Sequence, residues 1–348
     1  MAEQQFSWPL IGNRQITEFL ERSILNNSLG GTYIFYGPDN LGKTTLAVHF
    51  ARILFCQAKD RKVLPCGQCP ACLSFTASHK GEGDKDNEQW AQSDFFLIKK
   101  EKDKKNITVE QVRDFIRSLA MTSFLNSYKI GIIKHAETLS AEAANALLKT
   151  LEEPKKKVII ILITHSLDAL PATIASRAQI LRFHPVSADV IYDYLIKDCG
   201  ASRSQAKNFA RLSLGRPALA VKFCQDKEFY QVYQERARVF LDFFNQNINE
   251  RLAAVEKIIG RQSGQTAVAS ARRIVQIWLG VLRDRLLLQF GYQDRIQHHI
   301  FESDLEKQTN ALTPEFLLSA VKLLRQAEKY LDANVNPRLV LENIAINL

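Results

Sequence analysis

The segment GPDNLGKT, residues 37–44, constrains the fold of this chain more than any other part of its sequence. It fits the pattern G-x-x-x-x-G-K-[ST] at every fixed position. It also lies between a β-rich run, TYIFYG (32–37), and a run with helical apolar spacing, TTLAVHFARILFC (44–56). In this context the glycines let the backbone wrap around an anion, and the helix N-terminus supplies amide donors and a favourable dipole. The sequence therefore predicts a phosphate-binding loop within an α/β domain.

The same pattern assigns roles to individual residues of the loop. Lys43 would contact the β- and γ-phosphates of a nucleotide, and Thr44 would reach Mg²⁺. The residues that we expect to bind ATP or ADP are Gly37, Pro38, Asp39, Asn40, Gly42, Lys43, Thr44 and Thr45. The alternative is a relic loop, which keeps the shape and binds no nucleotide.

Further strands and helices alternate through the first half of the chain. The expected strands are DFFLIKK (94–100), KIGIIK (129–134) and VIIILIT (158–164). The last of these is so apolar and β-branched that we expect it to be buried on both faces of a parallel sheet. Strand, phosphate loop, helix and strand in this order predict a P-loop α/β domain.

Capping signals mark the helices between these strands. Thr108 and Gln111 form a capping box at the start of one helix. Ser140 is the expected N-cap of the next helix, and Pro154 is expected to stop it.

From about residue 187 the sequence becomes helical, and from about 229 onward every segment carries apolar residues at i, i+3 and i+4. We therefore expect three domains. They are a P-loop domain at 1–186 with a cysteine-rich insertion at 56–72, a small helical lid at 187–228, and an all-α domain at 229–348.

Four of the six cysteines, Cys56, Cys66, Cys69 and Cys72, lie within seventeen residues. Three thiolates at C-x₂-C-x₂-C spacing can converge on one tetrahedral ion, and Cys56 at the helix end can complete the site. In a reducing compartment such a cluster indicates a metal site rather than disulfides. We expect structural Zn²⁺, since four thiolates leave no open position. The alternative is four buried, reduced cysteines.

The charge balance favours a polyanionic partner, because the net charge is +9 and the pI is near 9.2. No apolar run is long enough to predict a membrane span. The N-terminus has neither the basic flank nor the apolar core of a secretory signal, so we expect a cytoplasmic protein without a membrane partner.

Three histidines, His79, His135 and His165, could suggest catalysis. None of them has a Cys, Asp or His partner at a spacing that would define a triad. We expect each of them to be solvated or hydrogen-bonded.

Several segments together resemble the bacterial DNA polymerase III clamp-loader family. They are ANALLKTLEEP (144–154), LPATIASRAQ (170–179) and the C-terminal NVNPRLVLENIAINL (334–348). The resemblance covers essentially the whole chain and includes the cysteine knuckle. It implies an AAA+ fold with a nucleotide domain, a small helical lid and a collar that joins five subunits into a ring. The implied partners are the tau/gamma and delta subunits, the sliding clamp and primed DNA.

The segment IIKHAETLS (132–140) distinguishes two kinds of subunit within this family. Lys134 occupies the position of the metal-binding aspartate of the ATPase subunit, and His135 occupies that of the water-activating glutamate. Glu137 is expected to point elsewhere. The resemblance is therefore to the delta-prime kind, a component of the DNA polymerase III complex that binds nucleotide at most and does not hydrolyse it. The alternatives are an active tau/gamma-type ATPase and a stand-alone nucleic-acid-binding AAA+ protein, which no base-reading motif supports.

The resemblance also implies roles for three further residues. Arg177 matches an arginine that acts in trans on the nucleotide of the neighbouring subunit, from the start of a helix. Thr164 and Arg216 match the two sensor positions, and Arg216 would join the nucleotide-binding set. The sequence departs from the pattern in having Ala178 after the arginine, and in having one extra residue between Cys56 and Cys66.

Overall fold

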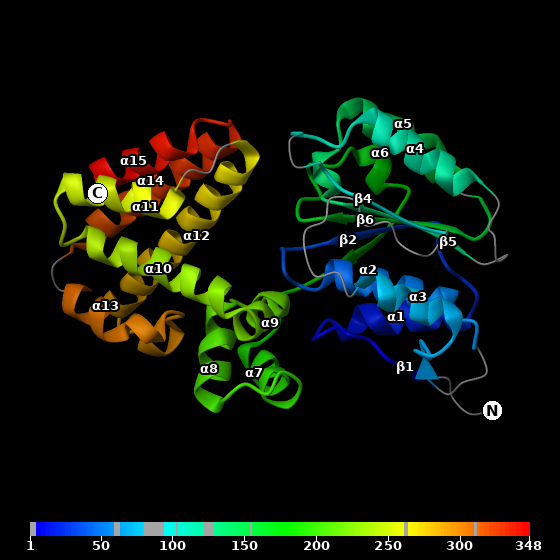
Figure 1. Ribbon diagram of the computed structural model, residues 1–348, viewed down its shortest axis with the longest axis horizontal. Coiled ribbons are helices and arrows are strands. Elements are labelled where there is room, and N and C mark those ends of the chain that lie inside the picture. Colours follow the sequence, from blue (N-terminus) through cyan, green and yellow to red (C-terminus); the bar gives the residue numbers. More distant parts are fainter. Residues whose placement is uncertain are drawn as a thin grey trace. The chain divides into compact units, whose positions relative to one another are not determined.

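The computed structural model describes residues 5–58, 63–79, 94–101, 104–121, 128–153, 155–260, 264–309 and 312–348. The chain divides into two compact units, Met1–Val186 and Ser187–Leu348 (Figure 1). The predicted boundary between a lid and a third domain, at 228/229, falls inside helix α10 (Lys227–Phe243). The division into three domains stays a prediction.

The first unit is built around a five-stranded, wholly parallel sheet in the order β4-β5-β6-β2-β7. Its strands are β2 (Thr32–Tyr36), β4 (Phe95–Ile98), β5 (Lys129–Lys134), β6 (Val158–Thr164) and β7 (Gln179–Arg182). A separate parallel pair joins β1 (Gln5–Phe6) to β3 (Val63–Leu64). Every residue of β6 is buried, which agrees with its uninterrupted apolar sequence.

Helices cover both faces of this sheet, with α1, α2 and α3 on one face and α4, α5 and α6 on the other (Figure 1). Their bounds are α1 (Arg14–Leu25), α2 (Lys43–Phe55), α3 (Pro70–His79), α4 (Val109–Ala120), α5 (Ala141–Glu152) and α6 (Ala172–Ala175). Along β2, Tyr33 and Phe35 pack in the first of these layers, whereas Ile34 packs in the second. This alternation follows from the two-residue period of a strand.

The predicted caps are present. Thr108 and Gln111 form a complete capping box at α4. The Ser140 side chain accepts a hydrogen bond from the Ala143 N–H at the start of α5. That helix ends at Glu152, and Pro154, its predicted stop, lies outside the described residues.

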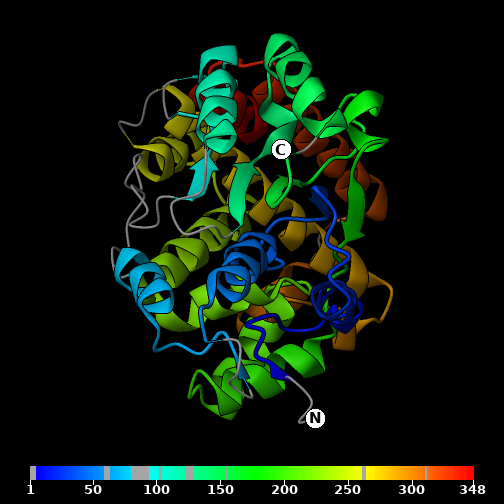
Figure 2. The same cartoon turned by 90° about the vertical axis from the view of Figure 1, so that its right-hand side faces the viewer.

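The described part of the second unit contains helices and no strands (Figure 1), and Figure 2 shows the same cartoon after a quarter turn. The longer helices are α7 (Ala188–Lys197), α8 (Arg203–Leu212), α9 (Pro217–Gln225), α10, α11 (Ile248–Ile259), α12 (Gly264–Gln289), α13 (Glu302–Thr309), α14 (Pro314–Asp332) and α15 (Pro337–Asn347). Helix α12 packs against α10, α14 and α15 and places Trp278 in the core. No helix among the described residues is long and apolar enough to span a bilayer.

Candidate functional site

The phosphate loop connects the end of β2 to the start of α2, as its sequence predicts. Gly37 and Gly42 adopt positive φ angles of 144° and 85°, a region that favours glycine. A Cβ atom on Gly37 would lie 2.5 Å from the carbonyl oxygen of Phe183, so no other residue fits there. The glycines are therefore required by the path of this loop as well as by access for an anion.

Lys43, the first residue of α2, is buried and points back into the loop. Its Nζ donates to the carbonyl oxygens of Gly37 and Pro38, the latter at 2.7 Å, and lies 3.7 Å from Asp39 Oδ1. Burial lowers the pKa of Lys43, and the negative charges of Asp39 and Glu137 oppose that shift. The lysine thus satisfies the loop's own carbonyls, and contact with a phosphate would require it to exchange these partners.

The remaining predicted loop residues lie around this lysine. Pro38, Asp39 and Asn40 are exposed, while Thr44 is half-buried and Thr45 exposed on the first turn of α2. The structure thus places the predicted residues of this unit on one loop and one helix N-terminus. Their contact with nucleotide stays a prediction.

Two neighbouring strands of the sheet each end directly before a histidine. Strand β5 ends at Lys134 and β6 at Thr164, so His135 and His165 follow directly. Carboxyl ends of parallel strands meet at one edge of a sheet, which brings these two histidines close together. Both direct Nδ1 to one oxygen, Glu137 Oε1, at 3.3 Å from His135 and 2.8 Å from His165.

The expectation that Glu137 points elsewhere is wrong. Glu137 lies in the short 3₁₀ helix η1 (Ala136–Thr138), and its side chain is only 8% exposed. Burial alone would raise its pKa, but hydrogen bonds with His135 and His165 hold the pKa well below its usual range. The pKa of His165 is raised in turn by Glu137. A charged carboxylate therefore lies close enough to the phosphate loop to act on Lys43 electrostatically.

Asp39 completes a cluster with these histidines. Ligand atoms of Asp39, His135 and His165 all lie within 4.8 Å of one another. The expectation of hydrogen-bonded histidines is met at His135 and His165, but sequence reasoning missed that they converge. Their positions directly after β5 and β6 were the signal. The side chain of His79 lies outside the described residues.

The two residues at sensor positions have local partners. Thr164 is buried, and its Oγ1 donates to the Ser166 carbonyl oxygen at 2.8 Å and accepts from the Ser166 N–H at 3.1 Å. In the second unit, Arg216 is the N-cap of α9, and its Nε donates to the Ser213 carbonyl oxygen at 3.0 Å. These contacts give both residues a structural use, and their sensor roles stay predictions.

Arg177 lies in the turn between α6 and β7, so the expectation that it begins a helix is wrong. Its Nη2 lies 2.8 Å from Glu152 Oε1, and its Nη1 donates to the carbonyl oxygen of Thr173 at 2.9 Å. The side chain keeps about a third of its surface exposed, 35%. The guanidinium is thus held at the surface by partners that are themselves partly solvated.

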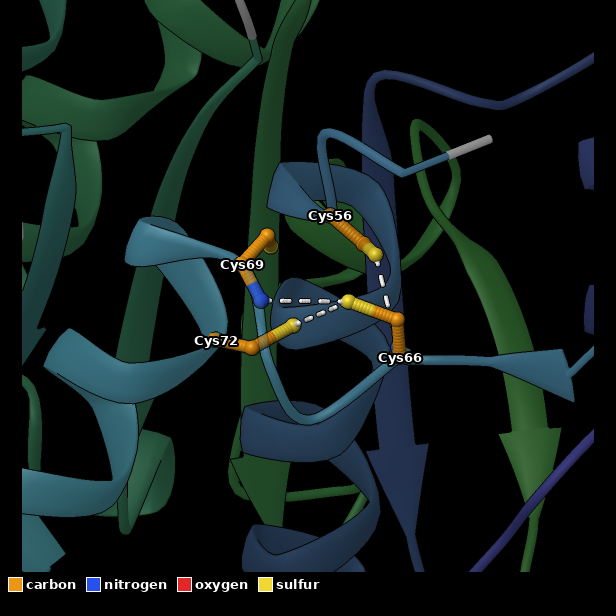
Figure 3. Close-up of side chains that lie close together, drawn as sticks. All are labelled: Cys56, Cys66, Cys69 and Cys72. Carbon is orange, nitrogen blue, oxygen red and sulfur yellow. Dashed lines mark hydrogen bonds between the residues drawn. The ribbon is translucent and has the colours of Figure 1, made fainter. Parts of the chain in front are cut away.

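The four clustered cysteines come together in space (Figure 3). Cys56 ends α2, Cys66 follows β3, and Cys69 and Cys72 flank the first turn of α3. All four sulfur atoms lie within 4.8 Å of one another, with Cys66 Sγ and Cys72 Sγ 4.0 Å apart. Four thiolates at ~2.3 Å from a tetrahedral zinc ion would be separated by ~3.8 Å. The arrangement fits one such ion with little movement.

Backbone amides support a thiolate in this cluster. The N–H groups of Gln68 and Cys69 donate to Cys66 Sγ at 3.5 and 3.3 Å, and the Cys66 N–H donates to Cys56 Sγ at 3.4 Å. These amides lower the pKa of Cys66 to about 6, whereas burial raises the pKa of Cys56 and of Cys72. A bound cation would offset that burial cost, because metal binding requires and stabilises the thiolate form.

A sequence model of the family described as DNA polymerase III, delta subunit matches residues 12–187, slightly more than half of the chain. The chain belongs to this family. The match to the DNA polymerase III delta subunit family includes the phosphate loop, the cysteine cluster, the histidine pair and Arg177.

Two individual relatives of the chain are delta-prime subunits. The chain is 28% identical over 329 residues to DNA polymerase III subunit delta-prime of Pseudomonas aeruginosa, with 90% of each chain covered. It is 26% identical over 355 residues to the delta-prime subunit of Bacillus subtilis, with 98% of each covered. The predicted resemblance to delta-prime subunits is confirmed.

A solved structure supports the fold. The crystal structure of a DNA polymerase III, gamma subunit-related protein from Thermotoga maritima matches with a TM-score of 0.56 at 19% identity, covering 94% of this chain and 97% of that one. The predicted fold class, an α/β domain with a parallel sheet followed by an all-helical part, is confirmed.

Proposed function

We propose that this chain is the delta-prime subunit of a DNA polymerase III clamp loader, which helps to load the sliding clamp onto primed DNA. Its similarity to delta-prime subunits extends over nine-tenths of the chain or more. The observation that carries the proposal within this family is the end of β5, where Lys134 and His135 replace the acidic pair of an ATPase. The partners would be tau/gamma and delta subunits in a five-subunit ring, in the cytoplasm.

The phosphate loop would bind ATP or ADP without hydrolysing it. The backbone amides of the loop and Lys43 remain as phosphate ligands. At the position of the Mg²⁺-binding aspartate, Lys134 turns attraction of the cation into repulsion. At ~4 Å and an effective dielectric constant of ~20, one such charge pair amounts to on the order of 4 kcal/mol.

One observation favours the alternative, an active tau/gamma-type ATPase. Glu137 is a buried, charged carboxylate close to the phosphate loop. Its Oε1, however, already faces Nδ1 of both histidines. A carboxylate held in this way is poorly suited to take a proton from water, so we favour the non-hydrolysing subunit.

The cysteine cluster would hold a structural Zn²⁺ on Cys56, Cys66, Cys69 and Cys72. When bound, the ion would neutralise thiolate charge and cross-link three chain segments. Cys56 and Cys72 already pack with Ile53 and Leu64 in a small buried cluster. Metal–thiolate bonds would add folding free energy to this small hydrophobic core.

Arg177 would act in trans on nucleotide bound to the neighbouring subunit. Its exposed pair with Glu152 contributes little to stability, so the arginine can leave it for a stronger anion. A guanidinium presents a rigid fork of donors to phosphate, which suits stabilisation of transition-state charge.

ATP turnover of the isolated full-length chain tests the choice between the two functions. The proposal expects no turnover above that of a Lys43→Ala variant, while labelled ATP or ADP still binds to the wild type. Turnover that is lost in Lys43→Ala and in Glu137→Gln would instead establish the chain as an ATPase with Glu137 in the acidic role.

A further inference from the structure

A second cluster of metal-binding residues lies at the carboxyl edge of the sheet, apart from the cysteines. Asp39 comes from the phosphate loop, His135 from the end of β5 and His165 from the end of β6. Their ligand atoms lie within 4.8 Å of one another. All three side chains are about half exposed, at 58%, 52% and 49%, so an ion could reach them from solvent.

Glu137 orients both histidines of this cluster. Its Oε1 faces Nδ1 of His135 and Nδ1 of His165, and the carboxylate is fixed by its own burial. A carboxylate accepts hydrogen bonds and cannot donate them when ionised, so each Nδ1 carries the proton. The nitrogen left with a lone pair on each ring is Nε2. Metal-binding histidines characteristically donate their other ring N–H to a carboxylate in this way.

We propose that Asp39, His135 and His165 bind a divalent transition-metal ion of the zinc class, with Glu137 as the positioning residue. Two imidazoles and one carboxylate are ligands that suit Zn²⁺ and its neighbours better than Mg²⁺. Three protein ligands leave a fourth position open to water or to an oxygen of a bound phosphate. This inference does not depend on the proposed clamp-loader role, since it concerns ligands supplied by this chain alone.

The competing explanation is that the histidines serve only to satisfy a buried carboxylate. That explanation accounts for His135 and His165, and the ion pair with Lys43 at 3.7 Å accounts for Asp39. The two explanations differ in what they expect of zinc, because hydrogen-bonding histidines need no ion. Zinc binding therefore separates them.

The test is Zn²⁺ binding by the full chain, measured by equilibrium dialysis and metal analysis. Wild type is expected to bind one equivalent beyond that held by the cysteines. The variant His135→Asn/His165→Asn should lose this equivalent, whereas His184→Asn, which removes an exposed histidine outside the cluster, should keep it. The variant Cys66→Ser/Cys69→Ser should also keep the additional zinc equivalent. That result would assign this equivalent to the histidine cluster.

Glu137→Gln tests the positioning role, since glutamine keeps the shape and loses the charge. It should weaken the histidine-site affinity by ~10–100-fold and leave the cysteine-site zinc unchanged. Co²⁺ added to the Cys66→Ser/Cys69→Ser variant should give visible bands that vanish with the histidine changes. Wild type without the additional equivalent, or an equivalent that survives His135→Asn/His165→Asn, would overturn the proposal.

Discussion

His165 Nδ1 lies 2.8 Å from Glu137 Oε1, at the sheet edge where the phosphate loop begins its turn into α2. In an ATPase of this fold class that edge would hold acidic side chains for Mg²⁺ and water. Here the carboxylate is engaged by imidazole, and Lys134 stands at the end of β5. This arrangement underlies the proposal that the subunit binds nucleotide without hydrolysing it.

The first prediction concerns the cysteine cluster. Protein purified without chelator and dialysed against metal-free buffer should retain close to one zinc per chain. Cys66→Ser should lose most of it and lower the thermal midpoint of unfolding, because metal binding contributes to folding free energy. Cys199→Ser, outside the cluster, is the matched control and should change neither quantity. A metal-free wild-type chain of unchanged stability would contradict the assignment.

A second prediction concerns the role of Mg²⁺ in nucleotide binding. ADP affinity of the wild type should change little when Mg²⁺ is removed, because Lys134 repels the cation. Lys134→Asp restores the acid, and we expect Mg²⁺ to raise the ADP affinity of that variant by at least about tenfold, or ~1.4 kcal/mol. Calorimetric titration with and without Mg²⁺ measures the ADP affinity of the wild type and of the variant. Strong Mg²⁺ dependence in the wild type would count against the proposed role of Lys134.

Arg177 gives a third prediction, in rings reconstituted with tau/gamma and delta subunits, clamp and primed DNA. Arg177→Ala should slow ATP turnover at the adjacent site, where trans-acting arginines typically contribute ~10³–10⁵ in rate. Arg177→Lys should rescue little, because a point charge lacks the forked donor geometry.

The surface partner of Arg177 supplies the control. If Arg177 served only to pair with Glu152, Glu152→Ala would reproduce the defect of Arg177→Ala. A trans role predicts near-normal turnover for Glu152→Ala and assembled rings for every variant. Equal defects in both variants would leave Arg177 as a structural residue.

His49 on α2 gives a prediction on pH. Its Nε2 donates to the carbonyl oxygen of Ser7, its ring lies 5.9 Å from that of Trp8, and burial lowers its pKa from 6.5 to about 4. Between pH 6.5 and 4 the unfolded chain binds a proton that the folded chain does not. The free energy of unfolding should therefore fall as pH falls through this window.

The matched variant is His49→Gln, which keeps a donor for Ser7 and cannot titrate. The thermal midpoint of the wild type should fall relative to His49→Gln as pH is lowered through the window, and the difference should level off below about pH 4. Parallel midpoints at all pH values would contradict the burial of a neutral imidazole.

Much of the fold was predictable because local and tertiary preferences agree. The run VIIILIT is too apolar to be anything but a central strand, and Thr108 with Gln111 specifies a helix start. The four cysteines were predictable as a cluster because knuckle spacing places their sulfur atoms together.

The histidine cluster was not predictable, because it depends on which strands become neighbours. His135 and His165 are thirty positions apart in sequence, and only the pairing of β5 with β6 brings them together. The expected direction of the Glu137 side chain is wrong for a related reason. A straight continuation of β5 would carry it away, but His135 adopts a φ of 54° and the chain turns into η1. Arg177 was misplaced because α6 precedes it instead of following it.

The proposed delta-prime role is tested most directly by the rate at which reconstituted rings load the sliding clamp onto primed DNA when only this chain is varied. The rate should fall to background when the chain is omitted and stay near that of the wild type with Lys43→Ala, because hydrolysis occurs in the neighbouring subunits. Loading that does not require this chain, or that is lost together with the chain's own ATP turnover in Lys43→Ala, would contradict the proposed role of a non-hydrolysing delta-prime subunit.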